Sequence, residues 1–408
     1  MIRRTLALVS SRSARVVSLV IVQAALGSVF AVLSARWLGP SDRGVVVLVA
    51  ALGSLLMLVG SLGVATGGRM LLSTNDPRYA LGAHRAVTWR LCTLHIMTVS
   101  LIGWPLLVVS DGWRGWSTGT AFLLYAVLML VVYLLREGLH GVGHHSLAIS
   151  ADLLLVSVQV LGALVLQLAH RVSLAGFLWL MAAAAALEVL FLLVSYRATA
   201  FGSITRSPIT TRQLVRLSAP ALAGVLGLAF ALRGDRVLLG VFGDPRSVGL
   251  YGTAATFSEM LLLVPLGLSQ VVFRHSGQGN HQLISRIRRF NWVLAIVMAA
   301  AFALLAKPAV LFLLGPAYAD AIPLIYLLIV GGIPLAGYYL ESAVLNGAGD
   351  FHGPAKAAGL GSLLLAVGCV ALIPEFGAQG AAASSIAAYG CMALYLVRLS
   401  RRQQRRDV

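Results

Sequence analysis

The chain has 408 residues, of which 59% are hydrophobic and only 11% are charged, and its mean hydropathy is +0.89. Soluble domains carry about 25% charged residues, so this composition excludes a soluble globular protein. The formal net charge is +17, but the basic residues are scattered between apolar runs and do not gather beside exposed aromatic residues, which argues against nucleic-acid binding.

Apolar runs of about 20 residues recur along the chain, and this is the length that an α-helix needs to cross a bilayer. They predict an all-α polytopic membrane protein with twelve spanning helices. The predicted spans are 16–38, 44–66, 91–110, 117–136, 147–168, 173–197, 214–241, 248–273, 287–306, 320–346, 354–373 and 377–399. The first run is too long for the apolar core of a signal peptide, so it is expected to be a retained span.

The distribution of lysine and arginine predicts the orientation. If the N-terminus is inside, the segments on the inner side carry 23 basic residues and those on the outer side carry 8. Short cytoplasmic loops of membrane proteins have such an excess. Both termini are therefore predicted to be cytoplasmic.

An internal repeat divides the chain. The stretch Trp37–Arg69 is echoed by Phe242–Arg274, and in both a Gly-Pro turn is followed by a second glycine and an apolar run. Gly44 and Gly249 correspond at an offset of 205, close to half the chain length. Six spans per half give a parallel repeat, with both halves entering the membrane from the same side. The predicted six-helix bundles are 1–205 and 206–408.

Four short motifs suggest a family. They are ARWLGPSDRG at 35–44, DRVLLGVFGDPRSVGLYGTAATF at 235–257, LLGPAYADAIPLIYLLIVGG at 313–332 and LNGAGD at 345–350. With them the chain resembles the multidrug/oligosaccharidyl-lipid/polysaccharide exporter superfamily, and within it the polysaccharide (Wzx-type) flippases, over essentially its whole length. The resemblance implies two bundles in a V around a central cavity that opens alternately to each side of the bacterial cytoplasmic membrane.

The same resemblance implies a function and its partners. The implied function is movement of an undecaprenyl-pyrophosphate-linked oligosaccharide from the inner to the outer leaflet for polysaccharide biosynthesis. The implied partners are that lipid-linked oligosaccharide, membrane lipids, a coupling ion (H⁺ or Na⁺) and other polysaccharide-assembly membrane proteins. Peptidoglycan-precursor flippases usually have two further spans, which argues against lipid II as cargo. No cofactor is expected.

Two alternatives to a flippase stay open, and a third, an enzyme, is not expected. A cation-coupled multidrug antiporter on the same scaffold is the nearest alternative, and a membrane scaffold that transports nothing is another. A membrane glycosyltransferase or ligase would need acidic residues in a large outer loop. The first outer loop is only about residues 39–43 with a single Asp42, so an enzyme is not expected.

Charged residues inside a span are costly and mark functional sites. Arg233, Asp235 and Arg236 lie within the seventh span, and the two arginines share one helix face because they are three residues apart. A guanidinium can bind a pyrophosphate through two hydrogen bonds, so this cluster is the first candidate for substrate binding. The alternative is an anchor at the outer interface, with Asp235 neutralising one arginine.

Two further groups are candidates. Arg69 and Arg274 correspond in the repeat and are predicted at the inner mouth of the cavity, where they either attract phosphate or anchor the helix ends. Glu188, Glu259 and Glu341 lie in spans six, eight and ten, where each either binds a coupling ion or pairs with an arginine. His140, His144 and His145 have metal-ligand spacing but no further ligand beside them, so no metal site is predicted.

Overall fold

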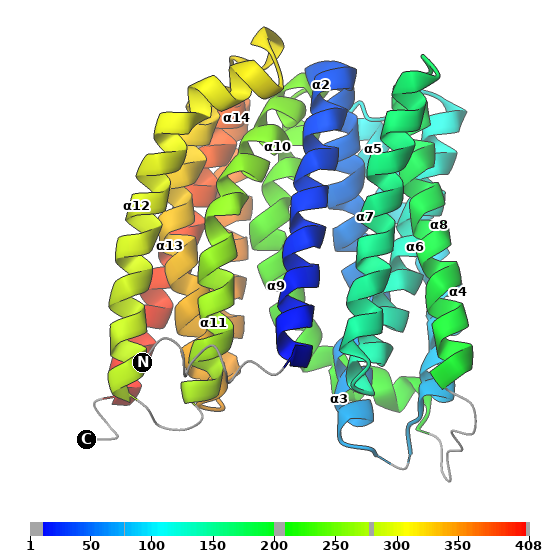
Figure 1. Cartoon of the computed structure of the whole chain (residues 1–408), viewed down its shortest axis with the longest axis vertical. Helices are drawn as coiled ribbons and strands as arrows, with labels where there is room; N and C mark the ends of the chain where they lie inside the picture. Colours follow the sequence, from blue (N-terminus) through cyan, green and yellow to red (C-terminus); the bar gives the residue numbers. More distant parts are fainter. Residues whose placement is uncertain (1–10, 77, 200–208, 277–280, 405–408) are drawn as a thin grey trace. The chain divides into compact units, whose positions relative to one another are not determined.

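The structure, a computed structural model, describes residues 11–76, 78–199, 209–276 and 281–404, and every regular element in these ranges is a helix (Figure 1). The α-helices are α2 (Ser11–Ser61), α3 (Val64–Ser73), α4 (Leu81–Thr98), α5 (Trp104–Val109), α6 (Trp116–Gly141), α7 (His145–Leu168), α8 (Leu174–Thr199), α9 (Thr211–Phe242), α10 (Pro245–Glu259), α11 (Leu263–Ser276), α12 (His281–Leu313), α13 (Ala321–Gly347) and α14 (His352–Gln404). Short helical turns are η1 (Val99–Gly103), η2 (Met260–Leu262) and η3 (Pro316–Tyr318).

The predicted all-α membrane fold is confirmed. In the part of the chain that the structure describes, ten helices are long and apolar enough to cross a membrane. Two of them, Ser18–Ser61 and His352–Arg402, have 44 and 51 residues, which at 1.5 Å per residue is about twice the thickness of the hydrocarbon core. Each of these two is bent at a glycine with non-helical backbone, Gly39 and Gly377. The predicted spans lie within these helices, to within two residues at their ends, except that 44–66 runs past the end of α2 at Ser61 into α3; the span 91–110 starts late.

The Gly-Pro turn of the first half is a single break in α2. Gly39 has φ 73°, a conformation that glycine adopts without steric cost, and Pro40 then restarts the helix. The corresponding turn of the second half ends α9 at Phe242 and begins α10 at Pro245, with Asp244 as N-cap accepting a hydrogen bond from the Ser247 amide (3.0 Å). Partial burial raises the pKa of Asp244, but the bonds from Ser247 outweigh it and hold that pKa below its ordinary value.

The third span begins earlier than predicted. The hydropathy pattern placed its start at residue 91, whereas α4 begins at Leu81 and includes Arg85 and Arg90. Long basic side chains can extend from a helix to the membrane interface, so they lower hydropathy without ending the helix. Arg90 donates a hydrogen bond to Thr211 Oγ1 (3.2 Å) at the start of α9.

The described chain forms two compact units. Unit 1 comprises Met1–Trp37, Leu52–Leu107 and Trp113–Leu222, and unit 2 comprises Leu38–Ala51, Val108–Gly112 and Ala223–Val408. The middle of α2 therefore belongs to unit 2. The repeat boundary at residue 205 stays a prediction.

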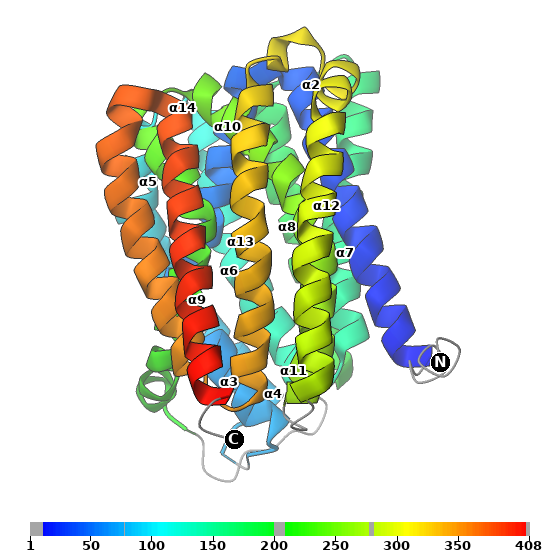
Figure 2. The same cartoon turned by 90° about the vertical axis from the view of Figure 1, so that its left-hand side faces the viewer.

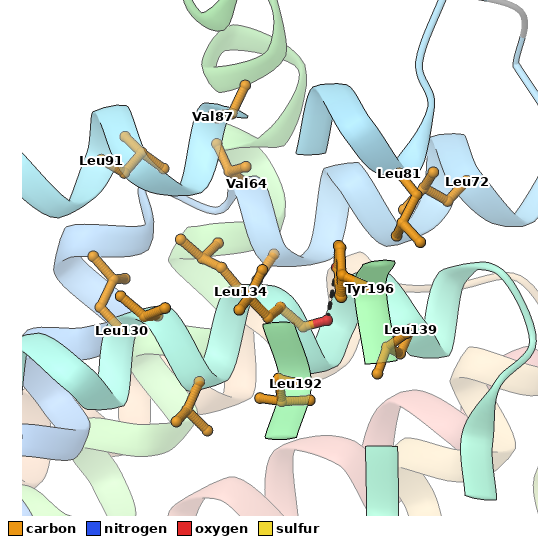
Figure 3. Close-up of a cluster of buried hydrophobic side chains, with 14 of the residues drawn as sticks. Val64, Leu72, Leu81, Val87, Leu91, Leu130, Leu134, Leu139, Leu192 and Tyr196 are labelled. Carbon is orange, nitrogen blue, oxygen red and sulfur yellow. Dashed lines mark hydrogen bonds between the residues drawn. The ribbon is translucent and has the colours of Figure 1, made fainter. Parts of the chain in front are cut away.

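Unit 1 is held together by an apolar core between α3, α4, α6 and α8. Leucine and valine side chains from these helices interlock in Figure 3, among them Leu130 and Leu134 of α6, which are fully buried. Tyr196 of α8 is buried as well, and its hydroxyl donates a hydrogen bond to the Leu135 carbonyl (2.8 Å). The Leu135 carbonyl accepts this bond from inside a helix, so the buried tyrosine hydroxyl has a hydrogen-bond acceptor within the core.

Unit 2 packs α13 between two neighbours. Figure 2 shows α13 with α12 on one side and the C-terminal limb of α14 on the other. A smaller core joins α11, α12 and α13 through Val272, Ile284 and Leu340, each at most 1% exposed. The C-terminal limb of α14 therefore packs along α13, and residues of α12, α13 and α14 line one of the cavities described below.

The two repeat-related turns pack on each other inside unit 2. A Cβ placed on Gly44 would lie 1.7 Å from the Pro245 carbonyl oxygen, and one placed on Gly249 would lie 1.9 Å from the Pro40 carbonyl oxygen. Gly44 corresponds to Gly249 and Pro40 to Pro245, both at an offset of 205. The contact is therefore symmetric with respect to the repeat.

Candidate functional site

Asp235 is the centre of a buried polar cluster in unit 2. Its side chain lies on α9, 2% exposed, and its Oδ2 accepts hydrogen bonds from the hydroxyls of Tyr251 on α10 (2.6 Å) and Ser385 on α14 (3.0 Å). Its Oδ1 accepts one from the backbone amide of Arg236 (2.8 Å). A buried carboxylate costs several kcal/mol unless donors surround it, and here three donors from three helices do so.

The Tyr251 hydroxyl is expected to stabilise this cluster measurably. Hydrogen bonds to charged groups contribute about 1.5–3 kcal/mol, so Tyr251→Phe should lower the stability of the purified protein by about that amount. Thermal unfolding in detergent measures the effect. Tyr326→Phe, at a tyrosine that is 41% exposed, should leave the melting temperature unchanged; an equal loss in both variants would remove the cluster as the cause.

Arg236 is committed to a carboxylate on the next helix. Its Nη2 forms an ion pair with Glu259 Oε1 at the end of α10, with the arginine side chain 13% and the glutamate side chain 53% exposed. Beside the pair is a cavity of about 30 Å³ that Asp235, Ser258 and Tyr389 also line. This volume is sufficient for a water molecule.

Arg233 differs from Arg236. It is exposed on α9, and in the described part of the chain it has no ion pair or hydrogen bond. Arg43 of α2 is a third, buried arginine within electrostatic range of Arg236. Of the two arginines of α9 in this cluster, Arg236 is neutralised by Glu259 and Arg233 forms no ion pair with a described residue.

The prediction for Asp235 is refined. The sequence alternative had this carboxylate neutralising an arginine, whereas its oxygens bind two hydroxyls and a backbone amide, and Glu259 takes the guanidinium of Arg236. Glu259 was predicted as a residue that binds an ion or pairs with arginine, and it is arginine-paired here.

Glu341 has an arginine partner as well. Arg288 of α12 approaches it with Nε 2.5 Å from Oε1 and Nη2 2.8 Å from Oε2, and Nη2 also donates to Ser400 Oγ (2.9 Å). Glu341 is 1% exposed. The forked geometry and the burial make this pair a connection between α12, α13 and α14, and leave its carboxylate little freedom to bind a coupling ion.

Glu188 is the exception among the three glutamates. It is fully buried on α8 in unit 1, and among the described residues no arginine forms an ion pair with it. Asp152 of α7 and Arg136 of α6 are the charged groups that act on it, and these two form an ion pair with each other. Two acids and one base therefore share an apolar bundle, which favours binding of a proton or a monovalent cation.

Arg69 and Arg274 have different surroundings. Arg69 of α3 pairs with Glu137 of α6 (3.0 Å) in unit 1, and its side chain is 49% exposed. Arg274, near the end of α11 in unit 2, is exposed and makes no ion pair with any residue that the structure describes. Of the histidines, His140 and His145 face each other with their Nδ1 atoms 3.0 Å apart. No third potential ligand joins them within the described ranges.

Three charged residues of these pairs were not predicted as site residues from the sequence: Arg136, Asp152 and Arg288. Asp152 lies inside a predicted span and Arg136 and Arg288 lie at span ends, so the cost of an intramembrane charge was a signal that could have marked Asp152. Nothing in the sequence pairs Arg288 with Glu341, since they are 53 residues apart.

The helical architecture and its intramembrane charges define a multi-pass membrane protein. No family model and no curated protein matches the sequence. Among solved structures, the inward-facing conformation of a multidrug resistance MATE family transporter of the MOP superfamily matches with a TM-score of 0.75 and 15% identity, over 93% of this chain and 94% of that chain. Its outward-facing counterpart gives 0.65 at 14% identity, over 96% and 94%.

A second kind of transporter matches over nearly the same range. The lipid II flippase MurJ, in an inward closed conformation, gives a TM-score of 0.66 and 14% identity over 94% of this chain and 86% of that chain. These likenesses show that the chain has the fold of MOP-superfamily transporters, as predicted. The polysaccharide branch is not distinguished by them and stays a prediction.

Proposed function

We propose that the protein is a flippase that moves a lipid-linked oligosaccharide, carried on undecaprenyl pyrophosphate, from the inner to the outer leaflet. The observation that carries the proposal is Arg233, an exposed arginine without an ion-pair partner in the described chain, on an apolar helix. It lies nine residues before the end of α9, about 14 Å along the helix axis. A cation exposed on an apolar helix is costly against lipid, so it is best explained by a water-filled route.

The chemistry of this cluster favours an anionic cargo. Arg233 offers a positive charge that no described carboxylate neutralises, whereas a site for cationic drugs would need an excess of acids. A guanidinium can hold two phosphate oxygens at once, which suits a pyrophosphate. The match to a lipid II flippase gives independent support for a lipid-linked cargo on this fold.

A cation-coupled multidrug antiporter is the second candidate. The inward-facing MATE transporter matches this chain with a higher TM-score than the lipid II flippase does, and Glu188 with Asp152 offers a site for a coupling H⁺ or Na⁺ in unit 1. Ion coupling is compatible with either cargo. The cargo therefore has to be tested separately from the ion.

The decisive experiment compares the two cargoes in one preparation. The full chain is reconstituted into liposomes with a fluorescently labelled undecaprenyl-pyrophosphate oligosaccharide, and its transfer between leaflets is followed by quenching from outside. Parallel liposomes report uptake of a cationic dye. Transfer of the labelled lipid without dye transport supports the flippase; dye transport without lipid transfer would replace it by the antiporter.

Glu188 is expected to carry the coupling ion. Glu188→Gln removes a buried carboxyl that lies beside a second acid, Asp152, and it should abolish the dependence of transport on an imposed H⁺ or Na⁺ gradient. Transport in liposomes with and without the gradient measures this. Glu375→Gln, at an exposed glutamate of α14, is the matched control. An unchanged gradient dependence in Glu188→Gln would make Glu188 a structural residue.

A further inference from the structure

Two adjoining cavities lie along the C-terminal limb of α14 in unit 2. One has a volume of about 400 Å³ and the other of about 590 Å³. Both are lined by Gly390 and Leu394, so they adjoin on neighbouring faces of the helix. We call this the α14 groove and define it by Arg288, Trp292, Gly390, Leu394, Arg398 and Arg401.

The groove is positively charged at one end. Arg398, Arg401 and Arg402 line it near the end of α14, and Arg398 and Arg401 are exposed. Among the described residues that line these cavities, Glu341 is the one acidic residue, and Arg288 already neutralises it. Three arginine charges in this end of the groove are therefore left without a lining carboxylate.

The rest of the groove is apolar and open. Trp292 and Leu394 form its walls, and the Leu394 side chain is 58% exposed. Trp292 packs onto Gly337, where an added Cβ would lie 2.7 Å from the indole ring. A Cβ at Gly390 would meet no atom within 4 Å, so the space at the middle of the groove is empty of protein.

A basic end joined to an apolar length matches one kind of ligand in a membrane. We propose that the α14 groove binds one anionic phospholipid, with its phosphate at Arg398 and Arg401 and an acyl chain along Trp292 and Leu394. Cavities of these volumes are typical of ligand sites, and an acyl chain explains the apolar length that a free phosphate would leave empty. The site lies apart from Arg233 and binds a resident lipid, so it goes beyond the proposed flippase function.

The charged end is tested with purified full-length protein in detergent. Native mass spectrometry counts bound dioleoylphosphatidylglycerol against dioleoylphosphatidylcholine, which has the same chains without net charge. Each arginine beside an anionic headgroup contributes about fivefold, so Arg398→Gln with Arg401→Gln should weaken phosphatidylglycerol binding by about 25-fold. Arg289→Gln, at an exposed arginine of α12 outside the lining residues, should change nothing.

The apolar length is tested by filling it. Gly390→Leu places a side chain in the open space and should abolish lipid binding, whereas Gly359→Leu, at a glycine of the same helix that also has no atom within 4 Å, should keep it. Equal binding of the two phospholipids, or full binding by Gly390→Leu, would overturn the proposal. The proposal would also be overturned if the protein were a dimer and Gly390→Leu dissociated it while lipid binding stayed the same, because the groove would then be a contact between two copies. If Gly390→Leu does not fold, the arginine variants decide.

Discussion

Replacing Gly44 or Gly249 by alanine is expected to remove most of the folded protein from a detergent extract. The added methyl group would lie 1.7 Å from the Pro245 carbonyl oxygen in the first variant and 1.9 Å from the Pro40 carbonyl oxygen in the second. These are backbone atoms, which cannot turn aside as a flexible side chain does. The cost should reach or exceed the ~3 kcal/mol upper end of ordinary overpacking.

The symmetry of this contact sharpens the test. Gly44 faces Pro245 of the other turn, and Gly249 faces Pro40 in the same way. The two single variants should therefore behave alike. The double variant should cost less than the sum of the two, since both changes force apart the same pair of turns. Size-exclusion chromatography and thermal unfolding measure the three variants side by side.

A glycine of the same helix serves as the control. Gly27 of α2 has no atom within 4 Å of an added Cβ, and alanine favours helix over glycine by about 1 kcal/mol. Gly27→Ala should therefore be neutral or slightly stabilising. Normal yields of Gly44→Ala would mean that the two turns do not touch in the folded protein.

The twelve spans were predictable because hydropathy depends on local composition. Their ends were harder: α4 continues over Arg85 and Arg90, whose side chains can leave the membrane while the backbone stays helical. The repeat identified Gly44 and Gly249 as equivalent positions. It could not show that their turns meet, because a repeat relates positions and says nothing of the contact between the copies.

The sequence predicts which residues belong to the candidate site. It does not predict which of them form ion pairs or hydrogen bonds with one another. The cost of burying charge picked out Asp235, Glu188 and Glu341 from the sequence. Which of them has a partner depends on side chains 53 residues away for Glu341 and 16 to 150 residues away for Asp235. The structure therefore separates Glu188, whose charged neighbours include a second acid, Asp152, from Glu259 and Glu341, which form ion pairs with arginines.

Arg233 and Arg236 are expected to contribute to transport in different ways. Arg233 makes no ion pair in the described chain and is available to a cargo phosphate, so Arg233→Ala removes only that attraction. A hydrogen bond to a charged group contributes about 1.5–3 kcal/mol, so loss of this contact should slow transfer of the labelled lipid about 10- to 150-fold. Protein level and melting temperature should stay unchanged.

Arg236→Ala is also expected to slow transfer, but for a different reason, which a second substitution tests. It leaves Glu259 as an uncompensated negative charge beside the route of an anionic cargo. Arg236→Ala combined with Glu259→Gln removes both charges and should recover part of the rate. If recovery is absent, Arg236 binds the cargo directly instead of masking Glu259.

Lysine at position 233 distinguishes charge from geometry. Arg233→Lys keeps the positive charge but cannot offer two parallel N–H donors to a pyrophosphate, so it should restore only part of the rate that Arg233→Ala loses. Arg246→Ala, which breaks an exposed ion pair with Asp320 at 3.1 Å, is the matched control and should transport normally. Removing an unpaired cation from the route should raise the energy barrier for a passing pyrophosphate. Full activity of Arg233→Ala would therefore mean that the cargo does not pass along α9.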